Sequence, residues 1–151
     1  MKFVADSMLG KLAKWLRILG HDTHYQSHYP MDIVELLVEE KRRLLSRRKA
    51  TVDQFKGALF IQNDNVGDQL REVDCRFPLF LGSEYIFSRC TLCNVLLEEA
   101  GVDMAKENIP DYVFYEHTRG VRVCPSCKRY YWPGTHRERV VRQLQAWKLL
   151  R

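Results

Sequence analysis

The chain has 151 residues, 46% hydrophobic and 28% charged, a balance that excludes an intrinsically disordered protein. It has no run of about 18 apolar residues, and Asp6 interrupts the first apolar stretch. We therefore expect no transmembrane helix, no secretory signal, no membrane partner and a cytoplasmic location. The net charge of +5 is concentrated in residues 89–151, a pattern typical either of a surface that binds a polyanion or of a solvated basic face.

The first half of the chain predicts alternating strands and helices. Residues Lys2–Ala5 predict a short strand, and Ser7 is the expected cap of the helix that follows. In that helix, leucines at spacings of three and four form one apolar face, and Lys11, Lys14 and Arg17 lie on the other side. Similar patterns predict a strand at 23–26, a helix at 30–43, a strand at 44–45, a strand at 58–62 and a helix at 66–77. This alternation predicts an α/β fold with a mostly parallel sheet flanked by helices.

The pattern breaks near Gly82, where we place a boundary between a first domain of residues 1–84 and a smaller module of residues 85–151. The module predicts a terminal helix capped by Thr135, and short strands at 112–115, 121–123 and 130–132. Its last 33 residues hold nine bases and one acid, so the terminal helix and its surroundings are basic.

Four of the five cysteines form two pairs with the spacing of metal-binding turns, Cys90-x2-Cys93 and Cys124-x2-Cys127. Each such turn presents two thiolates, and two turns complete the tetrahedral set that zinc prefers. The sequence therefore predicts a structural zinc site, with iron, an iron–sulfur cluster or four buried free thiols as alternatives. A zinc ion with four thiolates has no open position, so we expect it to stabilise the fold and not to catalyse. Cys75 stands alone and is predicted to be buried.

Three aspartates are predicted at one edge of the parallel sheet. Asp6 follows the first strand, Asp64 follows the strand at 58–62, and Asp32 begins a helix that faces the same edge. Ligands bind beyond the carboxyl ends of the strands in such sheets, and clustered carboxylates suit hard cations such as Mg²⁺ or Mn²⁺. We expect either a cation site at this edge or a scatter of solvated aspartates.

Basic and aromatic residues mark candidate contacts with nucleic acid. Lys128 and Arg129 follow the second cysteine pair directly, and the aromatic run 130–132 can stack on bases or pack the small module. Six bases occur within residues 41–49, where they can guide an RNA backbone to the acidic edge or form a solvated helix end. The predicted RNA-contacting residues are Lys11, Lys14, Arg47, Arg48, Lys128, Arg129 and Arg137.

Several segments resemble the Mut-seven C-terminal RNase family, whose members are PIN-like proteins with an appended zinc ribbon. The segments are FVADSMLGKLAKWLRILGHDT at 3–23, QLREV at 69–73, SRCTLCN at 88–94 and CPSCKRYYWPGTHRERV at 124–140. The resemblance implies a PIN-like fold, a structural zinc ribbon and a metal-dependent ribonuclease activity. It also implies acidic site positions, which fall on Asp6, Asp22, Asp32, Asp64 and Asp68.

One segment departs from the family pattern. The family usually has Leu-Leu-Thr-Arg-Asp at the end of a strand where this chain has Leu44-Leu45-Ser46-Arg47-Arg48. An arginine beside carboxylates pairs with them and competes with a divalent cation. Either Arg48 occupies the metal position and binds RNA phosphate, or Asp53 or Asp64 supplies the missing ligand.

These observations lead to three hypotheses. The first is a metal-dependent ribonuclease in which Asp6, Asp32 and Asp64 hold Mg²⁺ or Mn²⁺ while the zinc ribbon assists RNA binding. The second is a catalytically inactive RNA-binding or ribosome-associated module, which Arg48 favours. The third is a protein-interaction module whose ribbon binds a protein partner of unknown nature.

Overall fold

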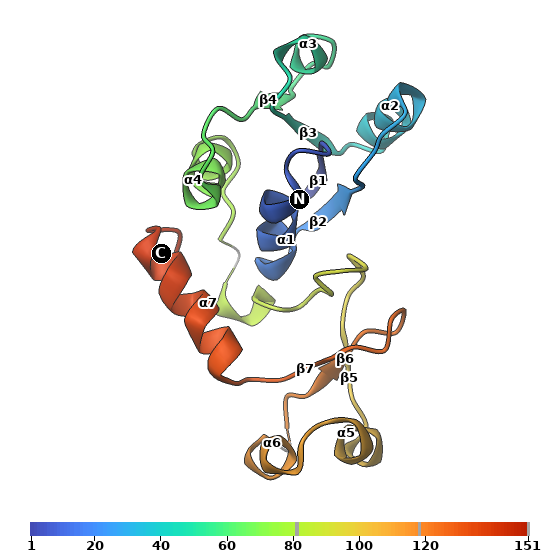
Figure 1. Ribbon diagram of the computed structural model, residues 1–151, viewed down its shortest axis with the longest axis vertical. Coiled ribbons are helices and arrows are strands. Elements are labelled where there is room, and N and C mark those ends of the chain that lie inside the picture. Colours follow the sequence, from blue (N-terminus) through green and yellow to red (C-terminus); the bar gives the residue numbers. More distant parts are fainter. Residues whose placement is uncertain (81, 118, 151) are drawn as a thin grey trace.

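The computed structural model describes residues 1–80, 82–117 and 119–150. Its first half contains a parallel sheet of four strands in the order β2-β1-β3-β4, which confirms the predicted α/β class (Figure 1). The strands are β1 (Lys2–Ala5), β2 (Asp22–Tyr25), β3 (Arg43–Ser46) and β4 (Leu59–Phe60). Ala5 lies beside both Tyr25 and Leu45, so the carboxyl ends of three strands meet at one edge. We call this edge, which Asp6 follows directly, the acidic edge.

The helices of this half cover the sheet. They are α1 (Gly10–Ile18), α2 (Met31–Glu39), α3 (Lys49–Val52) and α4 (Val66–Arg76). The predicted leucine face of α1 is confirmed, because Leu12 and Leu16 are fully buried in the main core. The predicted cap is wrong: Leu9 stands at the N-cap of α1, and the Met8 N–H is bound by the carboxylate of Asp6. None of the described helices is long and apolar enough to cross a membrane.

The second half is built around a small antiparallel sheet in the order β5-β6-β7. Its elements are η1 (Ser83–Tyr85), β5 (Glu98–Glu99), α5 (Val102–Asn108), α6 (Asp111–Glu116), β6 (Arg122–Val123), β7 (Tyr130–Tyr131) and α7 (Thr135–Ala146). The strand predicted at 112–115 is wrong, because these residues lie in α6. Val113 and Phe114 of α6 are buried in one small core with Ala105 of α5, so packing of the two helices overrides the strand propensity of the aromatic residues.

The chain returns to its first half through α7. Val140, Leu144 and Leu149 are buried in the same core as the leucines of α1. The ring centroids of Trp147 and Trp15 lie 4.7 Å apart. The predicted cap at Thr135 is wrong, since Gly134 is the N-cap and no side chain caps this helix. The division at residues 84 and 85 stays a prediction, and Arg151, one of the nine predicted bases, lies outside the described residues.

Candidate metal centre and acidic edge

The four cysteines of the two pairs come together in the second half of the molecule. Their Sγ atoms all lie within 4.8 Å of one another. Within the described ranges, they are the only group of three or more His, Cys, Asp or Glu side chains placed closely enough to share a metal ion. Cys75, by contrast, is exposed on α4, so the prediction that it is buried is wrong.

The two cysteine turns repeat one local geometry, and we call them the first knuckle (Cys90–Asn94) and the second knuckle (Cys124–Lys128). The N–H of the last residue donates to the carbonyl oxygen of the first cysteine at 3.0 Å in the first knuckle and 2.9 Å in the second. The second cysteine of each turn donates its N–H to the Sγ atom of the first, at 3.3 Å and 3.4 Å. Each turn ends in the left-handed region, with φ of 63° at Asn94 and 61° at Lys128. In each knuckle, the N–H of the second cysteine therefore points at the sulfur of the first, which a metal would bind as a thiolate.

This centre fits a zinc ion. A tetrahedron with zinc–sulfur bonds of about 2.3 Å has sulfur–sulfur edges of about 3.8 Å, and the Sγ atoms of Cys90 and Cys127 lie 3.8 Å apart. Burial raises the pKa of the Cys90 thiol, but hydrogen bonds from the Cys93 N–H and the Tyr131 hydroxyl outweigh it and lower the pKa to about 6. The hydrogen bond with Cys127 raises the pKa of Cys93 to about 11, as expected where several thiols crowd one another without a cation.

Arg17 of α1 binds the first knuckle to the first half of the molecule. The Arg17 guanidinium donates to the carbonyl oxygens of Thr91 at 3.0 Å and Leu92 at 2.9 Å, and to that of Thr23 at 2.9 Å. Arg17 is only 8% exposed, because the first knuckle covers the side of the helix on which it was predicted. Burial lowers the pKa of Arg17, and the three carbonyl acceptors offset the cost of removing the charge from water.

Asn94 makes the second attachment of the first knuckle. Its side-chain amide donates to Asp22 Oδ1 at 2.7 Å, and its side-chain carbonyl accepts the Thr23 N–H at 2.9 Å. Asp22 also pairs with Arg42 at 2.7 Å. Burial raises the pKa of Asp22, but the bonds from Arg42 and Asn94 outweigh it, and the pKa falls below its usual value. Asp22 therefore serves this junction, at the end of the sheet opposite the acidic edge.

The second knuckle makes no such attachment among the described residues. Pro125, Ser126, Cys127, Lys128 and Arg129 are all exposed. The sequence placed Lys128 and Arg129 among the RNA-contacting residues, and the structure puts both side chains in water.

At the acidic edge, Asp6 is held by three hydrogen bonds. Its Oδ1 accepts the Met8 N–H at 2.8 Å, and its Oδ2 accepts the Ser46 hydroxyl at 2.6 Å and the Arg47 N–H at 2.9 Å. Ser46 is fully buried and in turn accepts the Arg48 N–H at 3.0 Å. The carboxylate is thus fixed in orientation and remains partly exposed.

The other predicted acids do not gather around Asp6. Asp64 pairs with the Arg47 guanidinium at 2.5 Å, and its side chain is 90% exposed. Asp32 lies in the first turn of α2 and is exposed. Asp53, at the end of α3, is exposed, and Asp68 pairs with a neighbour within α4, Arg71.

Arg47, not Arg48, is the arginine that contacts the acids. It joins Asp6 through its backbone N–H and Asp64 through its guanidinium. Arg48 is exposed at the N-cap of α3 and forms no ion pair with any described residue. Sequence reasoning singled out Arg48 because it replaces an acid, whereas only the path of the chain after β3 decides which arginine reaches Asp64.

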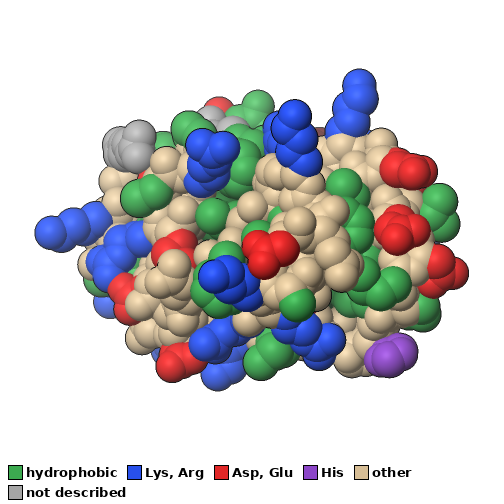
Figure 2. Space-filling view, turned by 90° about the horizontal axis from the view of Figure 1, so that it is seen from above, with side chains coloured by type: hydrophobic (Ala, Val, Ile, Leu, Met, Phe, Trp, Pro, Cys, Tyr) green, Lys and Arg blue, Asp and Glu red, His purple; other side chains and the backbone are tan. Residues whose placement is uncertain are grey.

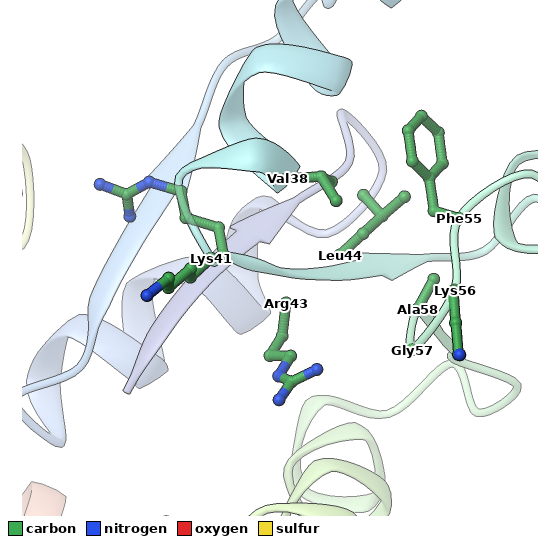
Figure 3. Close-up of a pocket in the computed structure, with 9 residues that line it drawn as sticks. Val38, Lys41, Arg43, Leu44, Phe55, Lys56, Gly57 and Ala58 are labelled. Carbon is green, nitrogen blue, oxygen red and sulfur yellow. The ribbon is translucent and has the colours of Figure 1, made fainter.

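The bases of residues 41–49 are divided between the two ends of the sheet. β3 begins at Arg43 and ends just before Arg47, so its length of about 13 Å separates the two groups. Lys41 and Arg43 line a cavity of about 250 Å³ at the amino end of the strand, with Lys56 across from them (Figure 3). The prediction of one basic track toward the acidic edge is therefore wrong for the first three bases.

The remaining predicted RNA-contacting residues fall in two places. Lys11 is exposed on α1, near the acidic edge. Lys14, Arg129 and Arg137 line one larger cavity of about 590 Å³. Seen from the α3 end, the surface mixes Lys and Arg side chains with Asp and Glu side chains, so that face is not uniformly basic (Figure 2).

Two structural contacts were missed by sequence reasoning. Asn94 was not singled out, although an asparagine directly after a Cys-x2-Cys turn suits the left-handed position there. The hydrogen bond from the Tyr131 hydroxyl to Cys90 Sγ, at 3.3 Å, was also missed, because no sequence spacing places a residue of β7 beside the first knuckle.

Comparison with known proteins gives one match. The sequence model of a family described as the Mut7-C RNAse domain matches residues 1–144. No curated protein and no solved structure matches the chain significantly.

Proposed function

Because the chain belongs to the Mut7-C RNAse domain family, we propose that it is a ribonuclease that cleaves RNA phosphodiester bonds at the acidic edge. The family match over residues 1–144 supports RNA as the substrate. Sheets of this parallel α/β kind bind their ligands beyond the carboxyl ends of the strands, which is where Asp6 lies. The proposal includes the division into a PIN-like domain (1–84) and a zinc-ribbon module (85–151).

The observation that carries the proposal is the position of Asp6. Three hydrogen bonds, from Met8, Ser46 and Arg47, orient its carboxylate at the end of β1. Two of these donors are backbone N–H groups, so the orientation depends mainly on the fold and not on mobile side chains. A carboxylate that is fixed in this way and partly open to solvent can serve as a general base in the cleavage of a bound phosphodiester.

Binding of Mg²⁺ or Mn²⁺ by Asp6, Asp32 and Asp64 is a separate part of the proposal. Carboxylates suit these cations, but among the described residues these three do not form one cluster. Asp64 pairs with Arg47 instead, so it would have to leave this exposed ion pair to join Asp6. The arrangement therefore does not fit a ready cation site, and cleavage is assigned here to Asp6 alone.

The zinc ribbon is proposed to hold RNA and not to cleave it. A metal bound by four thiolates has no open coordination position, so its role is to keep the two knuckles together. Lys128, Arg129 and Arg137 would then contact RNA phosphates.

A cleavage assay on labelled structured RNA with added Mn²⁺ tests the proposal. Wild type is compared with Asp6→Asn, and Asp103→Asn, which alters an exposed acid on α5, serves as the matched control. We expect Asp6→Asn to lose cleavage while it stays folded and keeps its zinc content. Its melting temperature should fall, because the asparagine amide can accept hydrogen bonds at only one of the two positions where Asp6 accepts them. Cleavage by Asp6→Asn at the wild-type rate would overturn the assignment, and cleavage without Mg²⁺ or Mn²⁺ would remove the cation from it.

A second candidate is an RNA-binding protein that does not cleave. The ion pair of Arg47 with Asp64 favours it, because the guanidinium neutralises an acid that a cation would need. This candidate expects salt-sensitive RNA binding without divalent cations, no cleavage by wild type, and weak Mn²⁺ binding in calorimetry. Tight Mn²⁺ binding that Asp6→Asn removes would count against it.

A further inference from the structure

A groove of about 590 Å³ lies where the ribbon meets α1 and the start of α7. Its volume falls in the range of sites that hold small organic ligands, about 300–1,000 Å³. Its lining comes from parts of the chain that are far apart in sequence, including Lys14 on α1, Tyr112 on α6 and Arg137 on α7. The groove exists only because the chain returns through α7 to its first half.

The groove is strongly basic. Lys14, Arg122, Arg129 and Arg137 line it, and Glu84 is the one acid among its lining residues. None of these four bases forms an ion pair with a residue that the structure describes. Arg137 is held by the Ser83 carbonyl oxygen at 2.9 Å, which neutralises no charge. The site therefore presents unpaired positive charge to an anion.

Aromatic rings line the same groove. Tyr112 is 68% exposed, although it stands next to the buried Val113 and Phe114 in α6. Trp132 follows β7 and is partly exposed at the groove wall. Trp132 also packs on the small core that Val113 and Phe114 belong to, so it offers only part of its surface to the groove, whereas Tyr112 is largely free. Accessible aromatic surface beside unpaired cations is the combination that binds unpaired bases and their phosphates. The bases of a duplex are already stacked on one another and offer no free faces to such rings.

Helix α1 leads from the groove toward the acidic edge. Lys14 lines the groove, and Lys11 lies about one turn, or 4.5 Å along the helix axis, nearer to Asp6. Both side chains are exposed and share one face of the helix. An RNA strand that leaves the groove along α1 therefore passes the Lys11 ammonium group before it reaches the acidic edge.

We propose that this groove binds an unpaired segment of RNA, with bases against Tyr112 and Trp132 and phosphates on Arg129, Arg137 and Lys14. The choice of RNA rests on the proposed function, whereas the groove is argued from its own lining. The segment is held away from Asp6, so the groove selects which RNA is presented to the acidic edge. Structured RNA with a single-stranded extension fits this arrangement better than a blunt duplex.

The first test compares two tyrosines on the same helix. Tyr112 lines the groove, whereas Tyr115 is equally exposed, at 71%, and does not. Binding of a fluorescein-labelled single-stranded RNA octamer is followed by anisotropy with zinc-loaded protein, without Mg²⁺ or Mn²⁺. We expect Tyr112→Ala to weaken binding about 10-fold, as loss of one stacked base does, and Tyr115→Ala to change it less than about 2-fold. Equal effects of the two variants would overturn the proposal.

The second test addresses the phosphates. The double variant Arg129→Ala/Arg137→Ala is expected to reduce the slope of log affinity against log salt concentration by about 1.4, since each single-strand phosphate contact contributes about 0.7. Lys106→Ala/Arg142→Ala removes two exposed bases outside the groove and should leave the slope unchanged. An unchanged slope in the first variant, or a blunt RNA duplex bound as tightly as the octamer, would contradict the groove.

The two proposals fail separately. If wild type cleaves nothing but Tyr112→Ala still weakens octamer binding, the ribonuclease proposal fails and the groove stands. If wild type cleaves RNA while Tyr112→Ala and Tyr115→Ala bind the octamer alike, the groove fails and the ribonuclease stands.

Discussion

The two knuckles have the same backbone and opposite surroundings. In both, an N–H group points at the first thiolate and the last residue adopts a left-handed conformation. At that last position the first knuckle has Asn94, which is bound to β2, and the second has Lys128, which is exposed. A metal site built from a repeated turn is thus attached to the fold through one half and open to solvent through the other.

Under the proposed function, this difference gives the two halves of one candidate metal centre different roles. The first knuckle positions the centre, because Arg17 and Asn94 connect it to α1 and to the start of β2. The second knuckle leads directly into Arg129, Tyr130 and the strand β7, which line the proposed groove. Substitutions in the first knuckle should therefore change stability, and those in the second should change RNA binding.

We expect the largest effect from variants that remove one cysteine of the metal centre that the two knuckles share. Cys93→Ser and Cys127→Ser should each reduce the zinc content from one ion per chain to nearly none, because a structural zinc site of this kind contributes about 10–16 kcal/mol at neutral pH. Elemental analysis after dialysis measures this. Cys75→Ser, at an exposed cysteine outside the centre, should keep one zinc ion. Full zinc content in either knuckle variant would show that the centre is not a four-thiolate site.

The next largest effect is expected from a variant that removes the hydrogen bonds between α1 and the first knuckle and leaves the second knuckle unchanged. Arg17→Ala leaves three carbonyl oxygens without their charged donor, so we expect the free energy of unfolding to fall by about 3 kcal/mol. Arg129→Ala, at an exposed position beside the second knuckle, should change it by less than about 0.5 kcal/mol. Urea unfolding measures both, and similar values for the two would mean that Arg17 does not anchor the centre.

A matched pair of glycine substitutions should give effects of opposite sign. Asn94→Gly keeps a residue suited to the positive φ but removes two side-chain hydrogen bonds, so stability should fall by about 1–2 kcal/mol. Lys128→Gly relieves a left-handed non-glycine residue with no bond to lose, so stability should rise by up to about 0.5 kcal/mol. Thermal unfolding of both variants is the measurement, and destabilisation of equal size in both would contradict the asymmetry.

The smallest effect concerns the pH dependence of stability that His21 contributes, just before β2. His21 precedes β2, is fully buried, and donates from Nε2 to the Leu79 carbonyl oxygen at 2.7 Å. Burial lowers the pKa of His21 below its ordinary value of 6.5, so the folded protein takes up this proton less readily than the unfolded chain. The stability that neutral His21 contributes is fully present above pH 6.5 and is lost as the pH falls below that value. The free energy of unfolding then decreases with a slope approaching about 1.4 kcal/mol per pH unit. Urea unfolding between pH 7 and 5 should show a shallower decline in His21→Gln than in wild type.

Much of the first half could be predicted from local pattern. The strand at Lys2–Ala5 and the leucine face of α1 were predicted because burial in that half follows the periodicity of the sequence. Arg17 was misplaced for a physical reason: helical spacing puts it opposite the leucines, but the first knuckle, more than 70 residues later in the chain, covers that side. Tyr112 was likewise assigned to a strand because its neighbours are aromatic, whereas its neighbours Val113 and Phe114 are buried in one small core with Ala105 of α5 and the segment is helical.

The acidic edge shows the same division between pattern and packing. Strand and helix order placed Asp6 at the carboxyl end of β1, and the structure has it there. Whether Asp32 and Asp64 act with it depends on side-chain directions across several loops, and Arg47 holds Asp64 instead. Their catalytic roles stay predictions.

By itself, the sequence determined the spacing of the cysteines, the alternation of strands and helices, and the resemblance to a ribonuclease family, because these depend on residues close together in the chain. Only the tertiary structure decided that one knuckle is anchored and the other open, that Arg47 contacts Asp64, and that Lys14, Tyr112 and Arg137 line one groove. These depend on how segments distant in sequence pack, and packing is set by the burial of the whole core and not by any local pattern.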